Sequence, residues 1–251
     1  MEINWFNKKD SDCVITLSKE DFKNGEFNLN LNLKLKDYKR TLQKGDLIKF
    51  NLGSKMIAPE SKFANEYRVL KVDGNKAYIV SMYELNRMEF GNSQKYFGND
   101  IDRFLEYGFY NSLSEKAKDA IVINSITQNY FESNDSRNEE QYSSYANSSI
   151  DKSDGFYSRH IALLDYQDVL EYFNYKYSEE DIYKTFFKDE KYGGGHSFWL
   201  RSARSDYSDI VWYVDGYSGY VSNYYYDNRF AVRPAFKIDL SKIDWEFVDE
   251  D

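Results

Sequence analysis

Side chains able to carry out acid–base or nucleophilic chemistry are few in this chain. It contains two histidines, His160 and His196, and a single cysteine, Cys13. A catalytic triad or a histidine-rich metal site needs several such groups together, and neither histidine lies in a recognisable motif. The run GGGH at 193–196 reverses the glycine order of a lipase oxyanion loop and is typical of a flexible loop. The sequence therefore predicts no enzyme, no cofactor and no metal site.

Residue types suited to binding another molecule, in contrast, are concentrated near the C-terminus. Residues 201–228 read RSARSDYSDIVWYVDGYSGYVSNYYYDN; they hold seven of the 24 tyrosines and no lysine, glutamate or glutamine. Tyrosine provides a large, rigid contact at small entropic cost, while Ser, Asn and Gly adapt their hydrogen bonding. Long charged side chains are costly to order and desolvate. This composition favours an antibody-like binding surface over the alternative, a tyrosine-rich edge strand.

Length and charge limit the class of protein. The chain has 251 residues, 41% of them hydrophobic, and a net charge of −9, which argues against a nonspecific nucleic-acid binder. One cysteine excludes an intrachain disulfide. The start, MEINWFNKKDSD, lacks the features of a signal peptide, and no apolar run reaches membrane-spanning length. We expect a cytoplasmic or virion-associated protein without membrane insertion.

Hydrophobic periodicity predicts the elements that must position the tyrosine-rich segment. Alternation predicts strands at 26–38 (EFNLNLNLKLKDY) and in GDLIKFNLG, the latter closed by Gly53, and a hairpin at 66–85 that turns at DGN. Helical spacing predicts one or two helices within 99–122, with Asn99 or Asp100 as the cap.

The rest of the pattern alternates between loops and short elements. Residues 132–158 are polar and predict a long flexible insertion, and 161–173 predict a strand start and then a helix opening near Asp165. Short strands follow up to residue 240. The order strands, helices, strands indicates an α+β fold. We expect an N-terminal β extension (1–42) packed on a domain spanning 43–251.

Three stretches resemble a known family. FWLRS (198–202), VWYVDGYSGYV (211–221) and AVRPAFKIDL (231–240) are similar to the C-terminal signature of a bacterial domain family with a C-type-lectin-like fold. Several members of that family look like variable proteins of diversity-generating retroelements. The resemblance covers about residues 43–241 and implies small antiparallel sheets, two or more helices and long loops.

The resemblance also implies a mechanism for the unusual composition. In such systems a reverse transcriptase copies a template with errors at adenines, and the copy replaces the variable segment. Asn codons changed in this way become Tyr, Ser, Asp, Gly, Arg or Ala, among others, but never Lys, Glu, Gln, Met or Trp. Residues 203–228 obey this rule everywhere except at Trp212, which would be a fixed template residue.

The resemblance divides the segment into two sets. The frame set would support the surface: Trp199, Leu200, Arg201, Ser202, Trp212, Val214, Gly219, Val221, Val232, Arg233, Pro234 and Ala235. The displayed set would contact the ligand: Ser205, Asp206, Tyr207, Ser208, Asp209, Tyr213, Asp215, Tyr217, Ser218, Tyr220, Ser222, Asn223, Tyr224, Tyr225, Tyr226, Asp227 and Asn228. Ala203, Arg204 and Arg229 fit either set. The family usually has Pro-Gly where Ala203 and Arg204 stand, so the first displayed loop is the less certain assignment.

The function implied is that of a display protein, of phage or prophage type, that binds a protein or glycan ligand through a hypervariable surface. One alternative is a lectin-like domain of fixed specificity; a calcium-dependent sugar motif of the Glu-Pro-Asn type is absent. Another is a formylglycine-generating-type enzyme, which would need a cysteine pair where this chain has only Cys13. We expect substitution of Tyr224, Tyr225 and Tyr226 by Ala to remove binding with little loss of stability.

Overall fold

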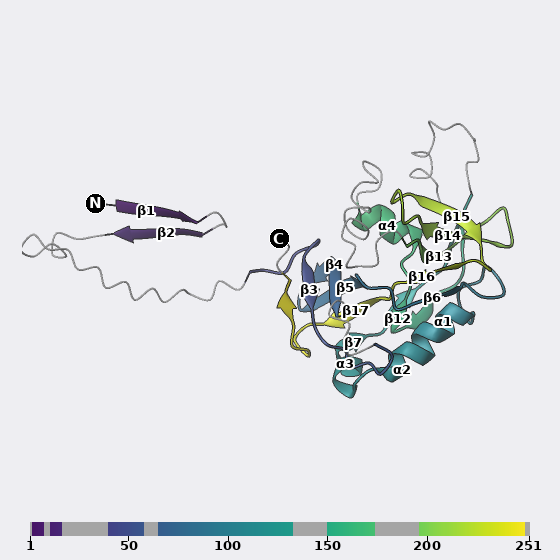
Figure 1. Cartoon of the computed structure of the whole chain (residues 1–251), viewed down its shortest axis with the longest axis horizontal. Coiled ribbons are helices and arrows are strands. Elements are labelled where there is room, and N and C mark those ends of the chain that lie inside the picture. The colour runs from purple at the N-terminus through teal and green to yellow at the C-terminus, as the bar shows by residue number, and fades with distance from the viewer. Residues whose placement is uncertain are drawn as a thin grey trace, which may run out of the picture. The chain divides into compact units, whose positions relative to one another are not determined.

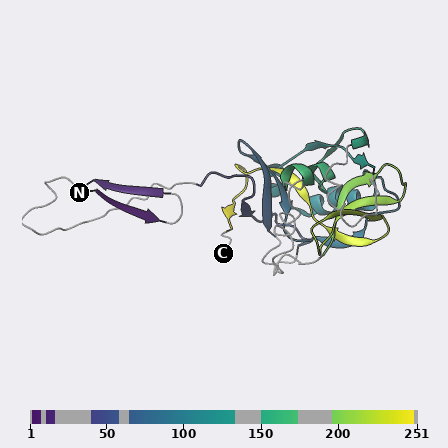
Figure 2. The ribbon, with the colours of Figure 1, turned by 90° about the horizontal axis from the view of Figure 1, so that it is seen from above.

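The computed structural model describes residues 2–7, 11–16, 40–57, 65–132, 150–173 and 196–248. The chain divides into two compact units, residues 1–41 and 42–251 (Figures 1 and 2). In the first unit, β1 (Glu2–Asn7) and β2 (Ser11–Thr16) form an antiparallel hairpin. The strand predicted at 26–38 lies outside the described residues.

The first sheet of the second unit is a seven-stranded antiparallel ladder. Its order is β12–β17–β5–β4–β3–β18, and β7 pairs with β17. The predicted hairpin is confirmed, because Asp73 pairs with Lys76 across a two-residue turn in which Gly74 has a φ of +59°. The strands are β3 (Leu47–Lys49), β4 (Glu66–Asp73), β5 (Lys76–Ser81), β7 (Ile121–Val122), β12 (Ile161–Ala162), β17 (Ala235–Asp239) and β18 (Glu246–Phe247).

The second sheet is also seven-stranded and is organised around β13. Its path is β10–β9–β13–β14–β15, while β16 pairs with both β13 and β6. The pairings of β13 with β9 and with β16 are parallel, and all of its residues are buried. The strands are β6 (Asn86–Glu89), β9 (Asn129–Phe131), β10 (Ile150–Ser153), β13 (Phe198–Arg204), β14 (Ile210–Val214), β15 (Val221–Tyr225) and β16 (Arg229–Val232).

Helices form where the periodicity predicts them. A helical segment runs through α1 (Asp100–Arg103), the π-helical η2 (Phe104–Phe109) and α2 (Tyr110–Ser112), and α3 (Glu115–Ala120) follows. Asn99 is the N-cap of α1 by position, but its side chain donates to the carbonyl of Ser93 instead. The helix predicted near Asp165 is α4 (Tyr166–Tyr172), which begins with a capping box between Asp165 and Asp168.

The predicted insertion at 132–158 is not a loop throughout. Residues 133–149 lie outside the described residues, but β10 pairs with β9, and β11 (Tyr157–Arg159) pairs with β8 (Asn124–Ile126). The prediction is therefore wrong for the end of this segment. The sequence of this segment is polar and shows no alternation of apolar and polar residues, so it does not predict strands. The strands form because they pair with β9 and β8.

The fold is mixed α+β, with mostly antiparallel sheets and few helices. Its largest fully buried side chains include Trp199 and Trp212. The Trp212 ring stacks on Tyr166 of α4 at 5.1 Å, and its indole nitrogen donates to the carbonyl of Ala203 at 3.1 Å. Among the described helices, none has the length and apolar character needed to cross a lipid bilayer.

A buried arginine connects β13, α4 and the turn after β8. Arg201 Nε donates to the carbonyl of Thr127 at 2.8 Å, and Nη1 donates to the carbonyl of Leu163 at 2.6 Å and to Asp168 Oδ2 at 3.0 Å. Asp165 Oδ2 lies 3.7 Å from Nε. Burial raises the pKa of Asp168, and the guanidinium opposes that rise.

We predict that Arg201→Met lowers the free energy of unfolding by about 3–5 kcal/mol, because it leaves buried Asp165 and partly buried Asp168 without their cation. Urea unfolding measures the loss. The matched control is Arg103→Met at an exposed position of α1, which should change stability by less than about 0.5 kcal/mol. Similar small losses in both variants would show that Arg201 is dispensable to the fold.

Candidate functional site

Burial separates the two sets that the sequence distinguishes. Every member of the frame set is buried, and every member of the displayed set is partly or fully exposed. Ala203 and Arg204, which fit either set, are buried like the frame, whereas Arg229 is exposed. The structure thus places the tyrosine-rich segment across a surface whose supporting residues lie in the core.

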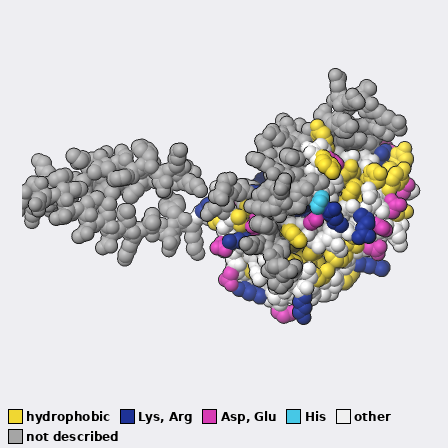
Figure 3. All heavy atoms as spheres, in the orientation of Figure 1, with side chains coloured by type: hydrophobic (Ala, Val, Ile, Leu, Met, Phe, Trp, Pro, Cys, Tyr) yellow, Lys and Arg dark blue, Asp and Glu magenta, His cyan; other side chains and the backbone are white. Residues whose placement is uncertain are grey.

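The centre of the surface is the β14–β15 hairpin. Across it Val211 pairs with Tyr224 and Tyr213 pairs with Ser222. Figure 3 shows hydrophobic and tyrosine side chains gathered over the region where Figure 1 places these strands, with acidic side chains beside them. Tyr224 and Tyr225 are 46% and 52% exposed, so their rings present apolar area and hydroxyls together.

A chain of aromatic contacts joins this exposed area to the core. Phe230 lies 4.5 Å from buried Trp199 and 4.5 Å from Tyr213, between ring centroids. Tyr224 contacts Phe230 at 6.1 Å and Tyr225 at 5.8 Å, both in edge-on geometry. Such contacts restrict the exposed rings before any ligand arrives. Phe230 is a supporting residue that the sequence did not single out, although it lies only two positions after the segment.

The first displayed loop, residues 205–209, is held by Arg204. Its Nε donates to Asp206 Oδ1 at 2.9 Å, its Nη2 also bonds the Asp206 carboxylate, and its Nη1 reaches Asn223 Oδ1 of β15 at 3.3 Å. The guanidinium carbon lies 4.3 Å from the Tyr207 ring centroid, a cation–π contact. The hydrogen bonds from Arg204 lower the pKa of Asp206.

A residue far away in the sequence supports the same loop. The side-chain amide of Gln94 lies 2.7 Å from the carbonyl oxygen of Tyr207, 3.1 Å from that of Arg204 and 3.3 Å from that of Ile210. With its nitrogen turned toward the loop, the amide donates to these carbonyls. Gln94 in turn accepts a 2.7 Å hydrogen bond from Gln128 Nε2 on its backbone oxygen. No local pattern identifies Gln94, because its role comes only from tertiary contact.

The second displayed loop, residues 215–220, is organised by Asp215. Its Oδ1 accepts from the backbone nitrogens of Tyr217 and Ser218 at 3.1 and 2.9 Å, and from Ser218 Oγ at 2.7 Å. Gly219 has a φ of +77°, which favours glycine. Tyr217 projects from this loop and is 85% exposed. Within the displayed set, Asp215 therefore orients the loop, and Tyr217 presents its ring to solvent.

Tyr226 differs from the two tyrosines before it. It is half-buried and packs against the core, its backbone nitrogen donates to the carbonyl of Asp209, and its own carbonyl accepts from Phe90. The expectation that replacing Tyr224, Tyr225 and Tyr226 together costs little stability therefore needs correction for Tyr226. The loss of stability should come from Tyr226, because its ring fills space against the core.

The two histidines contact different glutamates. His160 Nδ1 is 2.7 Å from Glu106 Oε1, and its ring stacks on Tyr110, whereas His196 Nδ1 is 3.0 Å from Glu84 Oε2. In the described ranges, no three His, Cys, Asp or Glu side chains form a group that could hold a metal ion. The glycines before His196 lie outside the described residues.

A family described as “Domain of unknown function (DUF6273)” matches residues 74–240. The chain belongs to the DUF6273 family. The matched part of this DUF6273 protein begins in the β4–β5 turn and includes the whole frame set and displayed set. No curated protein and no solved structure matches the chain.

We predict that the Asp206 carboxyl titrates below its ordinary value of 3.8, because Arg204 bonds the ionised form. Its native pKa then lies below its unfolded one, so the pairing stabilises the protein fully above pH ~4 and is lost as pH falls through the native pKa. Carboxyl NMR titration measures the midpoint. Arg204→Gln should return it toward 3.8, and an unchanged midpoint would contradict the assigned cause.

We also predict that Tyr226→Ala lowers the free energy of unfolding by about 1–3 kcal/mol, because it leaves a gap against the core. Its matched control is Tyr225→Ala, at a neighbouring position that is 52% exposed, where we expect a change within about 0.5 kcal/mol. Urea unfolding of both variants gives the comparison. Equal losses of stability in the two variants would contradict the prediction, because they would mean that Tyr225 and Tyr226 pack equally against the core.

Proposed function

We propose that this DUF6273 protein is a ligand-binding display protein with a C-type-lectin-like fold, whose displayed set contacts a protein or glycan. The observation that carries the proposal is the complete separation of displayed and frame sets by burial. A segment that varies must keep its variation out of the core, because most core substitutions destabilise. The observed burial meets that requirement at every assigned position.

Preorganisation of the two loops supports the same function. Arg204 and Asp215 hold the first and second displayed loops through hydrogen bonds within or beside the segment. A loop that is ordered before binding loses less conformational entropy when the ligand arrives. Exposed tyrosines on ordered loops then provide contact area, and neighbouring Ser, Asn and Asp side chains provide directional hydrogen bonds.

We propose further that the segment is diversified by adenine-directed retroelement mutagenesis. The absence of lysine, glutamate and glutamine from residues 203–228 supports this, and so does the burial of Trp212, the one residue there that breaks the codon rule. Sequencing the DNA around the gene tests it. We expect a near-copy of the part that encodes residues 199–235, differing at adenines, beside a reverse-transcriptase gene. If the DNA around the gene lacks that copy, the binding surface has a fixed specificity instead.

The binding surface itself is tested with a glycan array and a protein array. We predict that Tyr217→Ala combined with Tyr225→Ala weakens binding by about 2 kcal/mol or more, since exposed tyrosines contribute strongly to such interfaces. Tyr107→Ala, at a position of η2 that is 61% exposed, is the matched control and should bind like the unaltered protein. Binding that survives the double substitution would place the ligand site elsewhere.

A further inference from the structure

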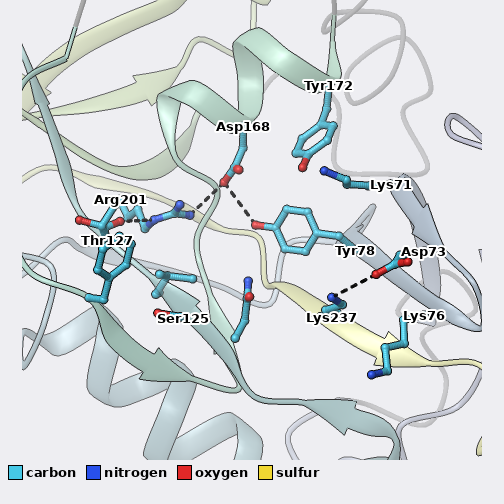
Figure 4. Close-up of a pocket in the computed structure, with 13 residues that line it drawn as sticks. Lys71, Asp73, Lys76, Tyr78, Ser125, Thr127, Asp168, Tyr172, Arg201 and Lys237 are labelled. Carbon is cyan, nitrogen blue, oxygen red and sulfur yellow. Dashed lines mark hydrogen bonds and ion pairs between the residues drawn. The ribbon is translucent and has the colours of Figure 1, made fainter.

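A pocket lies on the first sheet of the second unit, and none of its lining residues belongs to the displayed set (Figure 4). Its volume is about 390 Å³, at the lower end of the range for small-molecule sites. β4, β5 and β17 contribute one wall, α4 and residues 124–127 contribute others, and Arg201 of β13 also lines the pocket. A site of this kind takes a small ligand rather than a macromolecule.

Strand register places two lysines on either side of a tyrosine ring. Tyr78 of β5 pairs with Lys237 of β17 and with Lys71 of β4, so the three side chains share one face of the sheet. Figure 4 shows Tyr78 between the two lysines. Neighbouring strands lie about 4.8 Å apart, so the two lysine backbones are separated by about 10 Å. Two flexible lysine side chains can close this gap around a single anion.

The charge of the lining favours an anion. The chain has a net charge of −9, yet basic residues outnumber acidic ones in the pocket, with Lys71, Lys76, Lys237 and Arg201 against Asp73 and Asp168. Lys71 Nζ lies 3.8 Å from Glu171, and Lys237 Nζ lies 3.9 Å from Asp73. Ion pairs this long between exposed groups stabilise little. An incoming anion can therefore replace them at small cost.

The side chains of the inner wall of the pocket hydrogen-bond one another, which restricts their movement. Tyr78 donates to Asp168 Oδ2 at 3.3 Å, and Arg201 donates to the same oxygen at 3.0 Å. Arg201 is also bound to backbone carbonyls, so it orients the wall and leaves the lysines to meet the ligand. The Tyr172 ring lies 5.8 Å from that of Tyr78, tilted by 58°. These two rings form an aromatic surface beside the lysines.

We propose that this pocket binds a small phosphomonoester that carries one ring. Its phosphate lies between Lys71 and Lys237, and its ring contacts Tyr78 and Tyr172. A phosphomonoester carries close to two negative charges near neutral pH, which matches two ammonium groups, whereas a carboxylate carries one. Lysine binds phosphate as a point charge, whereas Arg201 already donates to Asp168 and to two backbone carbonyls.

The test titrates phenyl phosphate into the full chain by calorimetry. Phenol supplies the ring without the charge, inorganic phosphate supplies the charge without the ring, and glucose 6-phosphate supplies a sugar ring. We expect saturable binding of phenyl phosphate that weakens with added salt and becomes about tenfold weaker or more in the Lys71→Met, Lys237→Met double variant. Lys116→Met combined with Lys118→Met, which removes an equal charge from α3, should leave binding unchanged.

The outcomes separate the proposal from its rivals. Equal affinity in the double variant, with an unchanged unfolding midpoint, would overturn it, and so would the absence of saturable phenyl phosphate binding. Inorganic phosphate binding as tightly as phenyl phosphate would mean an adventitious ion only. Tighter binding of glucose 6-phosphate would support the proposal with a sugar ring. Tyr217→Ala with Tyr225→Ala should leave phenyl phosphate binding intact, so a failure of this pocket does not bear on the displayed set.

Discussion

The buried guanidinium of Arg201 is the interaction on which the rest of the second unit depends. A register shift between Trp199 and Ala203 takes the middle of β13 out of its ladder with β14, and there the Arg201 backbone nitrogen donates to the carbonyl of Leu164. The side chain then binds Asp168 and two carbonyls. A buried charge of this kind tolerates few arrangements, so it fixes β13 relative to α4.

β13 serves both sides of the second unit. On one side, Trp199 supports the aromatic contacts that continue to Phe230 and the exposed tyrosines. On the other, Arg201 orients Asp168 and, through it, Tyr78 in the pocket wall. Both surfaces thus rely on one buried strand, although they share no exposed residue. A substitution in one surface therefore need not disturb the other.

Support for the displayed loops comes from two kinds of residue. Arg204 and Asp215 lie within or beside the segment and form hydrogen bonds within their own loops, so the local sequence is enough to suggest this role. Gln94 lies over a hundred positions earlier and contacts three carbonyls in or beside the first loop. The stacking of Tyr166 on Trp212 is likewise invisible in the local pattern. Loop order is therefore a property of the whole unit rather than of the segment alone.

The sequence by itself determined the elements whose signals are local: the hairpin at Gly74, the helices after Asn99 and the start of α4 at Asp165. Turn geometry, capping and alternation act over a few residues, so they can be read from the chain. Only the tertiary structure decided that the end of the 132–158 segment forms strands, that Tyr226 packs inward, and that Lys71 and Lys237 flank Tyr78. These outcomes depend on partners distant in sequence, because pairing register and packing are set by the whole fold.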